Sequence, residues 1–250
     1  MRTNGNVVLI TGGGTGIGLA LAEAFLHAGN DVGICGRRAD QLDEARRRLP
    51  AICTLPCDVA DPAQRVRLVD WAGQALPGLN VLVNNAGIQL SVDFLGGAAG
   101  VETDEDEIDI NLKAPIRLAA LFIPHLARQG QASIVNISSG LGFVPLASVP
   151  VYCATKAAMH SFSLSLRHQL RETSIRVFEV VPPTVETGLD RGRRERAGFR
   201  DRGILPDEVA KGTLLALETD TFEAPIGGVD FLRLGARTNP EQVFQRINGG

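Results

Sequence analysis

The sequence predicts an α/β fold, with a doubly wound parallel sheet of seven strands and helices on both faces. Short apolar runs alternate with longer helical patterns along all 250 residues. The runs are almost continuously apolar, which is typical of strands buried on both faces. Strands separated by helices pair in parallel through right-handed crossovers. No linker or low-complexity tract interrupts the alternation, so we expect one domain over residues 1–250.

The elements follow in chain order from hydrophobic periodicity and from helix start and stop signals. We expect strands at residues 6–11, 31–36, 52–59, 80–87, 132–139 and 175–182, with a candidate last strand at 227–234. We expect helices at residues 18–29, 39–49, 62–76, 101–130, 151–172 and 205–218. Pro62 favours the first turn of its helix. Segment 101–130 has carboxylates early and basic residues late, which suits the helix dipole, and Pro115 predicts a bend in it.

The composition excludes several classes of protein. With 44% hydrophobic and 21% charged residues, the chain is typical of soluble globular proteins, and its net charge of −3 gives no nucleic-acid footprint. No apolar stretch approaches the roughly 18 residues of a membrane span. Cys53 and Cys57 have no second Cys/His pair, so we expect no metal site. The absence of a leader-like N-terminus favours a cytoplasmic protein with reduced thiols.

A glycine-rich turn, "TGGGTGIG" at 11–18, lies between the first predicted strand and the first predicted helix. Such a turn lets the backbone approach a pyrophosphate, which binds the N–H groups of a helix N-terminus. A bare glycine run indicates only a turn, but this position indicates a Rossmann-type dinucleotide site. The candidate cofactor-binding residues are Gly12, Thr15, Gly16, Ile17 and Gly18.

The end of the second predicted strand indicates which dinucleotide binds. An NAD site usually has an acidic residue there, about 20 residues after the glycines, on the ribose 2′-hydroxyl. Arg37 and Arg38 occupy this place, and the next acid is Asp40. A guanidinium fits a 2′-phosphate, which favours NADP(H) over NAD(H). The alternative is a solvated arginine pair at a loop tip.

Tyr152 is the chain's only tyrosine, and Lys156 follows it four residues later. On a helix these side chains lie on one face. An adjacent ammonium favours phenolate and would lower the tyrosine pKa from about 10, giving a group able to exchange a proton near neutral pH. The alternative is an amphipathic pair at a helix start.

Together these motifs resemble the short-chain dehydrogenase/reductase family, in its single-domain oxidoreductase branch. The residues that carry the resemblance, from about 6 to about 187, are the glycine turn, "CDV" at 57–59, "NNAG" at 84–87, Asn111 in "DINLKAP", Ser139 in "NISSG", and Tyr152-x3-Lys156.

The resemblance implies a role for each catalytic candidate. Tyr152 would be the general acid/base, and Lys156 would lower its pKa and bind the nicotinamide ribose. Ser139, 13 positions before Tyr152, would hold the substrate oxygen, and Ser138 is one place off that spacing. Asn111 would support a water that relays protons to Lys156.

The resemblance also implies the remaining cofactor contacts. Asp58 and Val59 would line the adenine, and the backbone at Asn85, Ala86 and Gly87 would lie along the adenosine ribose.

Segment "VPPTVET" at 181–187 departs from the family pattern NPG-x-V-x-T. Pro182, Val185 and Thr187 match, and the last two would hold the carboxamide. Val181 and Pro183 replace the usual Asn and Gly. Because proline lacks an N–H and has a fixed φ, we expect a stiffer nicotinamide wall and a reshaped substrate pocket.

Two segments leave alternatives open. The predicted substrate lid, 188–205, holds six arginines. They fit either an anionic substrate or a solvated helix with acidic partners. The C-terminal tail, 235–250, has a helical pattern at 240–247 and could cap the active site or join a subunit interface.

The resemblance implies an NADP(H)-dependent oxidoreductase acting on a carbonyl or secondary alcohol, a carbonyl reductase or alcohol dehydrogenase. The alternatives are an inactive dinucleotide-binding sensor or scaffold, and a lyase or epimerase. Segments 88–100 and 141–150 are apolar, which favours an apolar substrate. By analogy with relatives we expect a homodimer or homotetramer. The apolar face Ala157, Phe162, Leu164 and Leu166 fits such an interface and fits core packing equally well.

Overall fold

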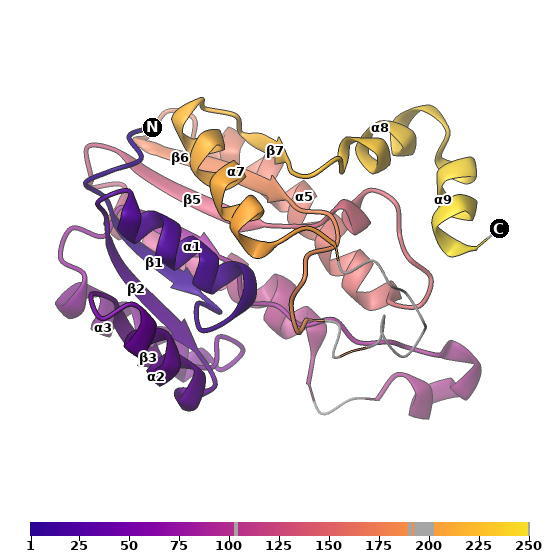
Figure 1. Ribbon diagram of the computed structural model, residues 1–250, viewed down its shortest axis with the longest axis horizontal. Helices are drawn as coiled ribbons and strands as arrows, with labels where there is room; N and C mark the ends of the chain where they lie inside the picture. The colour runs from indigo at the N-terminus through magenta and orange to yellow at the C-terminus, as the bar shows by residue number, and fades with distance from the viewer. Residues whose placement is uncertain (103–104, 190–191, 193–202, 250) are drawn as a thin grey trace.

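The computed structural model describes residues 1–102, 105–189, 192 and 203–249. Within these ranges the chain forms one parallel sheet of seven strands in the order β3-β2-β1-β4-β5-β6-β7 (Figure 1). The strands are β1 (Val7–Thr11), β2 (Asp31–Gly36), β3 (Cys53–Pro56), β4 (Val81–Asn84), β5 (Ala132–Ile137), β6 (Ile175–Val181) and β7 (Glu223–Pro225).

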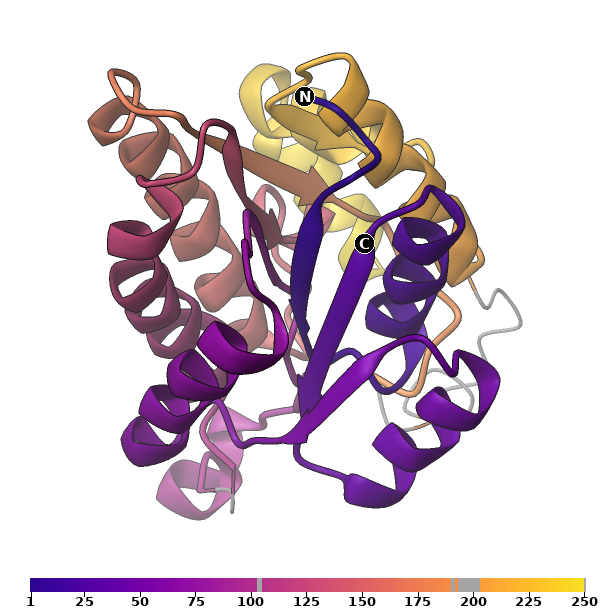
Figure 2. The same ribbon diagram turned by 90° about the vertical axis from the view of Figure 1, so that its left-hand side faces the viewer.

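Helices cover both faces of the sheet, so the predicted fold class is confirmed (Figure 2). They are α1 (Gly16–His27), α2 (Ala39–Arg48), α3 (Pro62–Ala75), α4 (Ala114–Leu126), α5 (Pro150–Gln169), α7 (Pro206–Glu218), α8 (Asp230–Thr238) and α9 (Pro240–Asn248). The chain reverses its direction of travel across the sheet between β1 and β4. In such sheets, ligands bind at the carboxyl ends of the strands beside this switch point.

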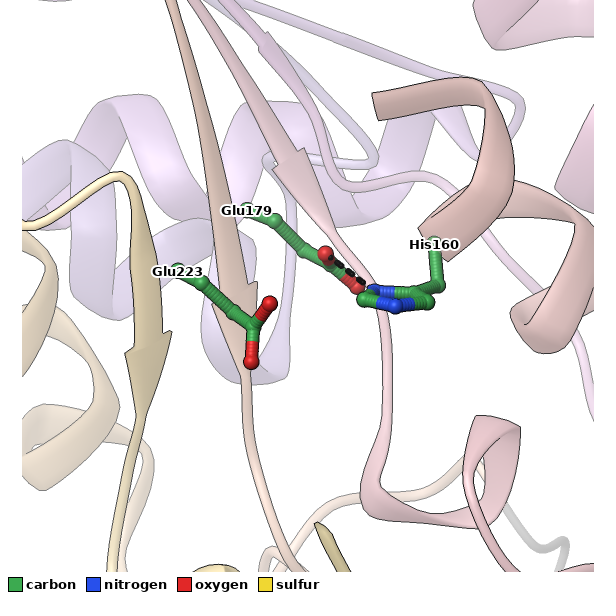
Figure 3. A group of neighbouring side chains, drawn as sticks. All are labelled: His160, Glu179 and Glu223. Carbon is green, nitrogen blue, oxygen red and sulfur yellow. Dashed lines mark hydrogen bonds and ion pairs between the residues drawn. The ribbon is translucent and has the colours of Figure 1, made fainter. Parts of the chain in front are cut away.

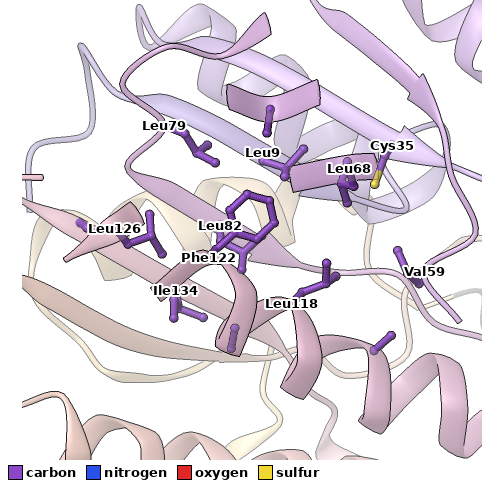
Figure 4. Close-up of a cluster of buried hydrophobic side chains, with 14 of the residues drawn as sticks. Leu9, Cys35, Val59, Leu68, Leu79, Leu82, Leu118, Phe122, Leu126 and Ile134 are labelled. Atoms are coloured by element: carbon purple, nitrogen blue, oxygen red, sulfur yellow. The ribbon is translucent and has the colours of Figure 1, made fainter. Parts of the chain in front are cut away.

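Two apolar layers hold the helices to the sheet. On one face Phe25 of α1 and Leu217 of α7 pack on Ile10 and Phe178. On the other face α3, α4 and α5 pack on β1, β4 and β5, in a cluster that includes the buried Phe122, Leu82 and Ile134 (Figure 4). The five central strands β2, β1, β4, β5 and β6 are mostly buried, which is the physical reason for their continuous apolar runs in the sequence, while the edge strands β3 and β7 are more exposed.

The last strand was predicted in the wrong place. Segment 227–234 is not a strand: β7 is Glu223–Pro225, and α8 begins at Asp230. Gly227 and Gly228 have φ of 58° and 80°, in the left-handed region, so the chain cannot continue as an extended strand there. The apolar residues after them are spaced three apart, which is a helical period.

The long helix predicted at 101–130 is also shorter than expected. Asp106 Oδ1 accepts from the backbone N–H groups of Ile108 and Asp109 at 2.7 and 3.1 Å, so the helical segment begins after it. A 3-10 segment, η1 (Phe94–Gly100), precedes it. Instead of a simple bend at Pro115, a π-helical segment η2 (Asp109–Lys113) leads into α4. Proline cannot donate a backbone hydrogen bond, which favours irregular pairing in this turn.

The C-terminal tail and the predicted lid have different outcomes. The tail helix predicted at 240–247 is confirmed as α9. The arginine-rich part of the predicted lid, at 190–191 and 193–202, lies outside the described residues. Of the helices in the described ranges, none has the length and apolar character that crossing a bilayer requires.

Candidate active site

The structure brings Ser139, Tyr152 and Lys156 together at the carboxyl edge of the sheet. Ser139 lies two residues after the end of β5 and is the N-cap residue of the short 3-10 segment η3 (Gly140–Gly142), while the other two lie on the first two turns of α5. The Ser139 side chain lies close enough to the Tyr152 phenol to affect its pKa. The Lys156 Nζ lies 5.5 Å from the centre of the Tyr152 ring. Each of the three residues is at most 6% exposed, so the group forms a desolvated cluster.

Lys156 is held from the sheet side. Its Nζ donates to the backbone carbonyl of Ile137 at 2.8 Å, at the end of β5. Ser138, the alternative serine, donates instead to the Val180 carbonyl at 3.3 Å. Ser138 therefore bonds to β6, whereas Ser139 is the serine that interacts with Tyr152.

Asn111 lies in the π-helical segment η2. Its amide donates to the Ile88 carbonyl at 2.8 Å and to Thr155 Oγ1 at 3.3 Å, and its oxygen accepts from the Ile88 N–H at 2.9 Å. It is therefore fixed beside the turn of α5 that carries Lys156. π-Helical turns recur at functional sites because they re-aim one side chain within a helix.

Burial shifts the pKa of both titrating groups of the site, Tyr152 and Lys156. Burial raises the pKa of Tyr152 above its ordinary value, and the Ser139 side chain offsets part of this rise. Burial lowers the pKa of Lys156 to about 8, opposed by the charge of Glu179. The expectation that Lys156 depresses the phenol pKa is therefore wrong for this structure. Desolvation penalises both charged forms and outweighs the attraction between them.

The glycine turn contacts the end of β4 closely. Gly12 and Gly16 have φ of 64° and 55°, a region that favours glycine. A Cβ on Gly12 would lie 2.8 Å from the Ala86 Cα. The Asn85 amide donates to the carbonyls of Thr11 and Gly12 at 2.9 and 3.1 Å. These contacts join the turn and the 85–87 segment into one rigid wall.

The start of α1 fits a phosphate group. Thr15 is the N-cap residue, but its side chain does not cap the helix, which leaves the first N–H groups without that partner. The described residues therefore fit the pyrophosphate of a dinucleotide. Ile17 is half-buried in the first turn and packs against the core.

The two arginines after β2 differ in their contacts. Arg38 Nη2 donates to Thr15 Oγ1 at 3.4 Å, so this guanidinium lies against the glycine turn. Arg37 forms an ion pair with Glu105, 68 residues further along the chain. Arg38 is therefore the guanidinium better placed to meet a phosphate on the adenosine ribose.

The Asp58–Val59 segment is fixed by residues that sequence reasoning missed. The Asp58 N–H donates to Gln64 Oε1 at 2.9 Å. The buried Arg65 donates to the carbonyls of Val59 and Ala60 at 2.6 and 2.8 Å. A buried arginine among the polar residues of an amphipathic helix gives no signal in the sequence.

The segment after β6 reaches back over the glycine turn. The Pro182 carbonyl accepts from the Gly140 N–H at 3.0 Å, and Val185 forms a bridge with Ile204. A Cβ on Gly16 would lie 3.0 Å from the Thr187 Cγ2. Thr187 therefore lies directly beside the phosphate turn.

A doubly wound parallel sheet with a glycine turn before its first helix defines the Rossmann class of nucleotide-binding proteins. Within that class the chain belongs to the short-chain dehydrogenase family, whose model matches residues 6–198. A relative in Bacillus subtilis (strain 168), named uncharacterized oxidoreductase DltE, is 50% identical over 248 residues, 99% of this chain and 98% of the relative. The chain is therefore an oxidoreductase of this family.

Solved structures agree with this assignment. A short-chain dehydrogenase from Sphingobium yanoikuyae in complex with NADPH is 29% identical, covers 96% of this chain and 95% of its own, and has a TM-score of 0.78. A family member from Burkholderia phymatum in complex with NAD shares the fold at a TM-score of 0.86, with 23% identity over 100% of this chain and 98% of its own. The neighbours thus include both nicotinamide cofactors.

Proposed function

We propose that this chain is an NADP(H)-dependent reductase or dehydrogenase that interconverts a carbonyl and a secondary alcohol. The observation that carries the proposal is the buried Ser139–Tyr152–Lys156 group beside the glycine turn. The bound cofactor would supply or accept the hydride.

The protein's own residues would manage the proton and the oxygen. Because burial raises the pKa of Tyr152, its phenol is protonated at neutral pH and can donate to the oxygen of a carbonyl. Ser139 would hold the same oxygen, and two donors aimed at a developing negative charge stabilise it where it forms. Lys156 would contact the nicotinamide ribose, and Asn111 would hold a water on the route to it.

The cofactor would extend along the carboxyl edge of the sheet. Its pyrophosphate would bind at Gly12–Gly18, Asp58 and Val59 would line its adenine, and its adenosine ribose would lie along Asn85–Gly87. Pro182, Val185 and Thr187 would contact the nicotinamide. The position of Arg38 against Thr15 favours NADP(H) over NAD(H).

The same family resemblance favours a homo-oligomer built on α4 and α5. Of the face considered in the sequence, Leu166 is buried in the core and Phe162 packs against it, while Ala157 and Leu164 are exposed. Leu164 therefore belongs to the surface that a second copy would cover, and size-exclusion chromatography with light scattering would measure the assembly.

One experiment tests the function. A panel of apolar and polar ketones, aldehydes and secondary alcohols is assayed with NADPH and with NADH by absorbance at the reduced-nicotinamide band. We expect net cofactor oxidation with at least one carbonyl, and loss of turnover in Tyr152→Phe with unchanged NADPH affinity. Binding without oxidation of any substrate would contradict the proposal and favour a sensor. A reaction without net cofactor use would favour a lyase or epimerase.

A further inference from the structure

Behind Lys156 lies a second group of titratable side chains that the proposed mechanism does not use. His160 on α5, Glu179 on β6 and Glu223 on β7 place ligand-type atoms within 4.8 Å of one another (Figure 3). His160 follows Lys156 by four residues and therefore lies one turn further along the same helix face. Glu179 is fully buried, which is unusual for a carboxylate.

The two carboxylates are neighbours in the sheet but have different partners. Glu179 and Glu223 are register partners on adjacent parallel strands. Arg233 Nη1 donates to Glu223 Oε1 at 2.9 Å, so that charge is already paired. Glu179 has no such guanidinium bond: its Oε2 lies 2.8 Å from His160 Nδ1. With Arg233 on Glu223, the cluster already holds a cation and does not call for a metal ion.

The second oxygen of Glu179 is the unexplained feature. Glu179 Oε1 is buried and has no hydrogen-bond partner among the described residues. Leaving such an oxygen without a partner costs free energy unless a compensating charge is close. The charge of Glu179 acts on two cations, Arg167 and Lys156. Lys156 is the buried one of the two, and its own hydrogen bond goes to a neutral carbonyl.

The register of the sheet connects the two groups. Asn136 of β5 is the partner of Glu179, and the next residue, Ile137, supplies the carbonyl that holds Lys156. Lys156 and Glu179 are therefore anchored at successive positions of adjacent strands, both beneath α5. This arrangement places the two opposite charges on the same side of the sheet, where burial limits their screening by solvent.

The charged and titratable groups around Lys156 come from several elements. Those on α5 are Tyr152, His160 and Arg167; the others are Glu179 on β6, Glu223 on β7, Arg233 on α8 and Glu107 before η2. Of these, Glu179 acts on Lys156 and on Arg167, whereas Glu107 acts on Tyr152. Glu179 is therefore the one carboxylate in this set whose charge acts on the Lys156 ammonium.

We propose that Glu179, oriented by the ring of His160, is a positioning residue that keeps Lys156 in its ammonium form. Its catalytic meaning rests on the proposed function, because only a charged Lys156 can support proton exchange by Tyr152. The carboxylate acts through Lys156 and touches neither substrate nor cofactor. The unpartnered Oε1 is then explained as a charge directed at a desolvated cation instead of a hydrogen-bonding group.

The test reads the charge of Lys156 directly. The chain has only three lysines, Lys113, Lys156 and Lys211, so the protein labelled with 13C at lysine Cε gives three NMR signals. Lys113→Arg and Lys211→Arg assign them. Ion pairs with Asp109 and Asp207 raise the pKa of the two surface lysines, while burial lowers that of Lys156 to about 8, so its titration is separate.

We expect Glu179→Gln to lower the Lys156 midpoint by about one pH unit, the low end of the shift that a nearby opposite charge produces. Glu179→Asp, which keeps the charge, restores most of the shift. Glu223→Gln is the matched control on the adjacent strand and leaves the midpoint unchanged. His160→Ala, at a partly exposed position, shifts the midpoint in the same direction by less, and it decides the matter if Glu179→Gln does not fold.

An unchanged Lys156 midpoint in both Glu179→Gln and His160→Ala would overturn the proposal. So would an equal shift in Glu223→Gln, because the effect would then be general to the cluster. The basic limb of the kcat profile should move with the midpoint. A shifted midpoint in a protein that turns over no carbonyl would support the positioning role and contradict the proposed function. Turnover of a carbonyl with an unshifted Lys156 midpoint would contradict the positioning role and support the proposed function.

Discussion

Comparing Gly18→Ala with Gly14→Ala tests whether close packing at one particular glycine, and not the number of glycines in the turn, is what cofactor binding requires. A Cβ at this position would lie 2.2 Å from the Gly12 carbonyl oxygen and 2.6 Å from the Asn85 amide nitrogen. An ordinary carbon–oxygen contact is about 3.3 Å, so the backbone of the turn must move by about 1 Å. Gly14→Ala is the matched control in the same turn, because its nearest contact would be an ordinary 3.4 Å.

The size of the effect follows from two opposing contributions. Overpacking against backbone costs about 1–3 kcal/mol, and replacing glycine by alanine in a helix returns about 0.5–1 kcal/mol. The net loss is about 1–2 kcal/mol, which corresponds to a 5- to 30-fold weaker population of the competent turn. For a chain of this size the melting temperature should fall by about 2–8 °C.

The assay is NADPH binding by fluorescence titration, together with a thermal melt of each variant. We expect Gly18→Ala to bind NADPH 5- to 30-fold more weakly, and Gly14→Ala to stay within about twofold of the native chain. Equal affinity in both variants, or equal loss in both, would refute the reasoning. Equal affinity would mean that the contact between the glycine turn and the end of β4 does not position the phosphate site. Equal loss would mean that any added methyl group in the turn weakens NADPH binding.

Three further predictions rest on single contacts. Arg38→Ala should raise the KM for NADPH about tenfold or more and leave that for NADH nearly unchanged, since it removes a guanidinium beside Thr15; equal effects on both cofactors would contradict a 2′-phosphate contact. Arg65→Met should lower the free energy of unfolding by about 1–3 kcal/mol in urea denaturation, because the carbonyls of Val59 and Ala60 lose their buried donor. Lys156→Met should stabilise the protein at pH 7 by up to about 3 kcal/mol relative to the native chain, and this difference should vanish between pH 8 and 10.5. Because burial lowers the pKa of Lys156 to about 8, the unfolded state binds the extra proton in that window, so native stability rises with pH there. A constant difference across the window would show that the native lysine is not desolvated.

Local patterns predicted most of the fold because they match the burial of each element. Six strands form where the sequence has apolar runs, and five of them, all but the edge strand β3, are mostly buried. The exception is β7, which has only three residues and is too short for a periodic signal. The glycines after it and the helical spacing of Phe231 and Leu234 carried the better information.

The candidate site was predictable where spacing along the chain encodes proximity in space. Tyr152 and Lys156 share a helix face, and Ser139 lies in the turn that follows β5. Glu179 could not be found in this way. In "IRVFEVV" it reads as one polar residue in an apolar strand, and its partner His160 is 19 residues away on another element. Only the pairing of β5 with β6 shows that it lies opposite Asn136, next to the residue whose carbonyl holds Lys156.

The pKa directions at the site bear on the proposed reaction. Desolvation moves the two groups oppositely: the phenol pKa rises and the ammonium pKa falls to about 8. As pH increases, Lys156 therefore loses its proton before Tyr152 does. Below pH 8 the site holds a protonated phenol beside an ammonium, which is the state required to donate a proton to a carbonyl oxygen. Above it, the neutral amine no longer assists the phenol in releasing a proton, so a desolvated pair of this kind favours reduction at neutral pH unless a ligand's charge reverses the order.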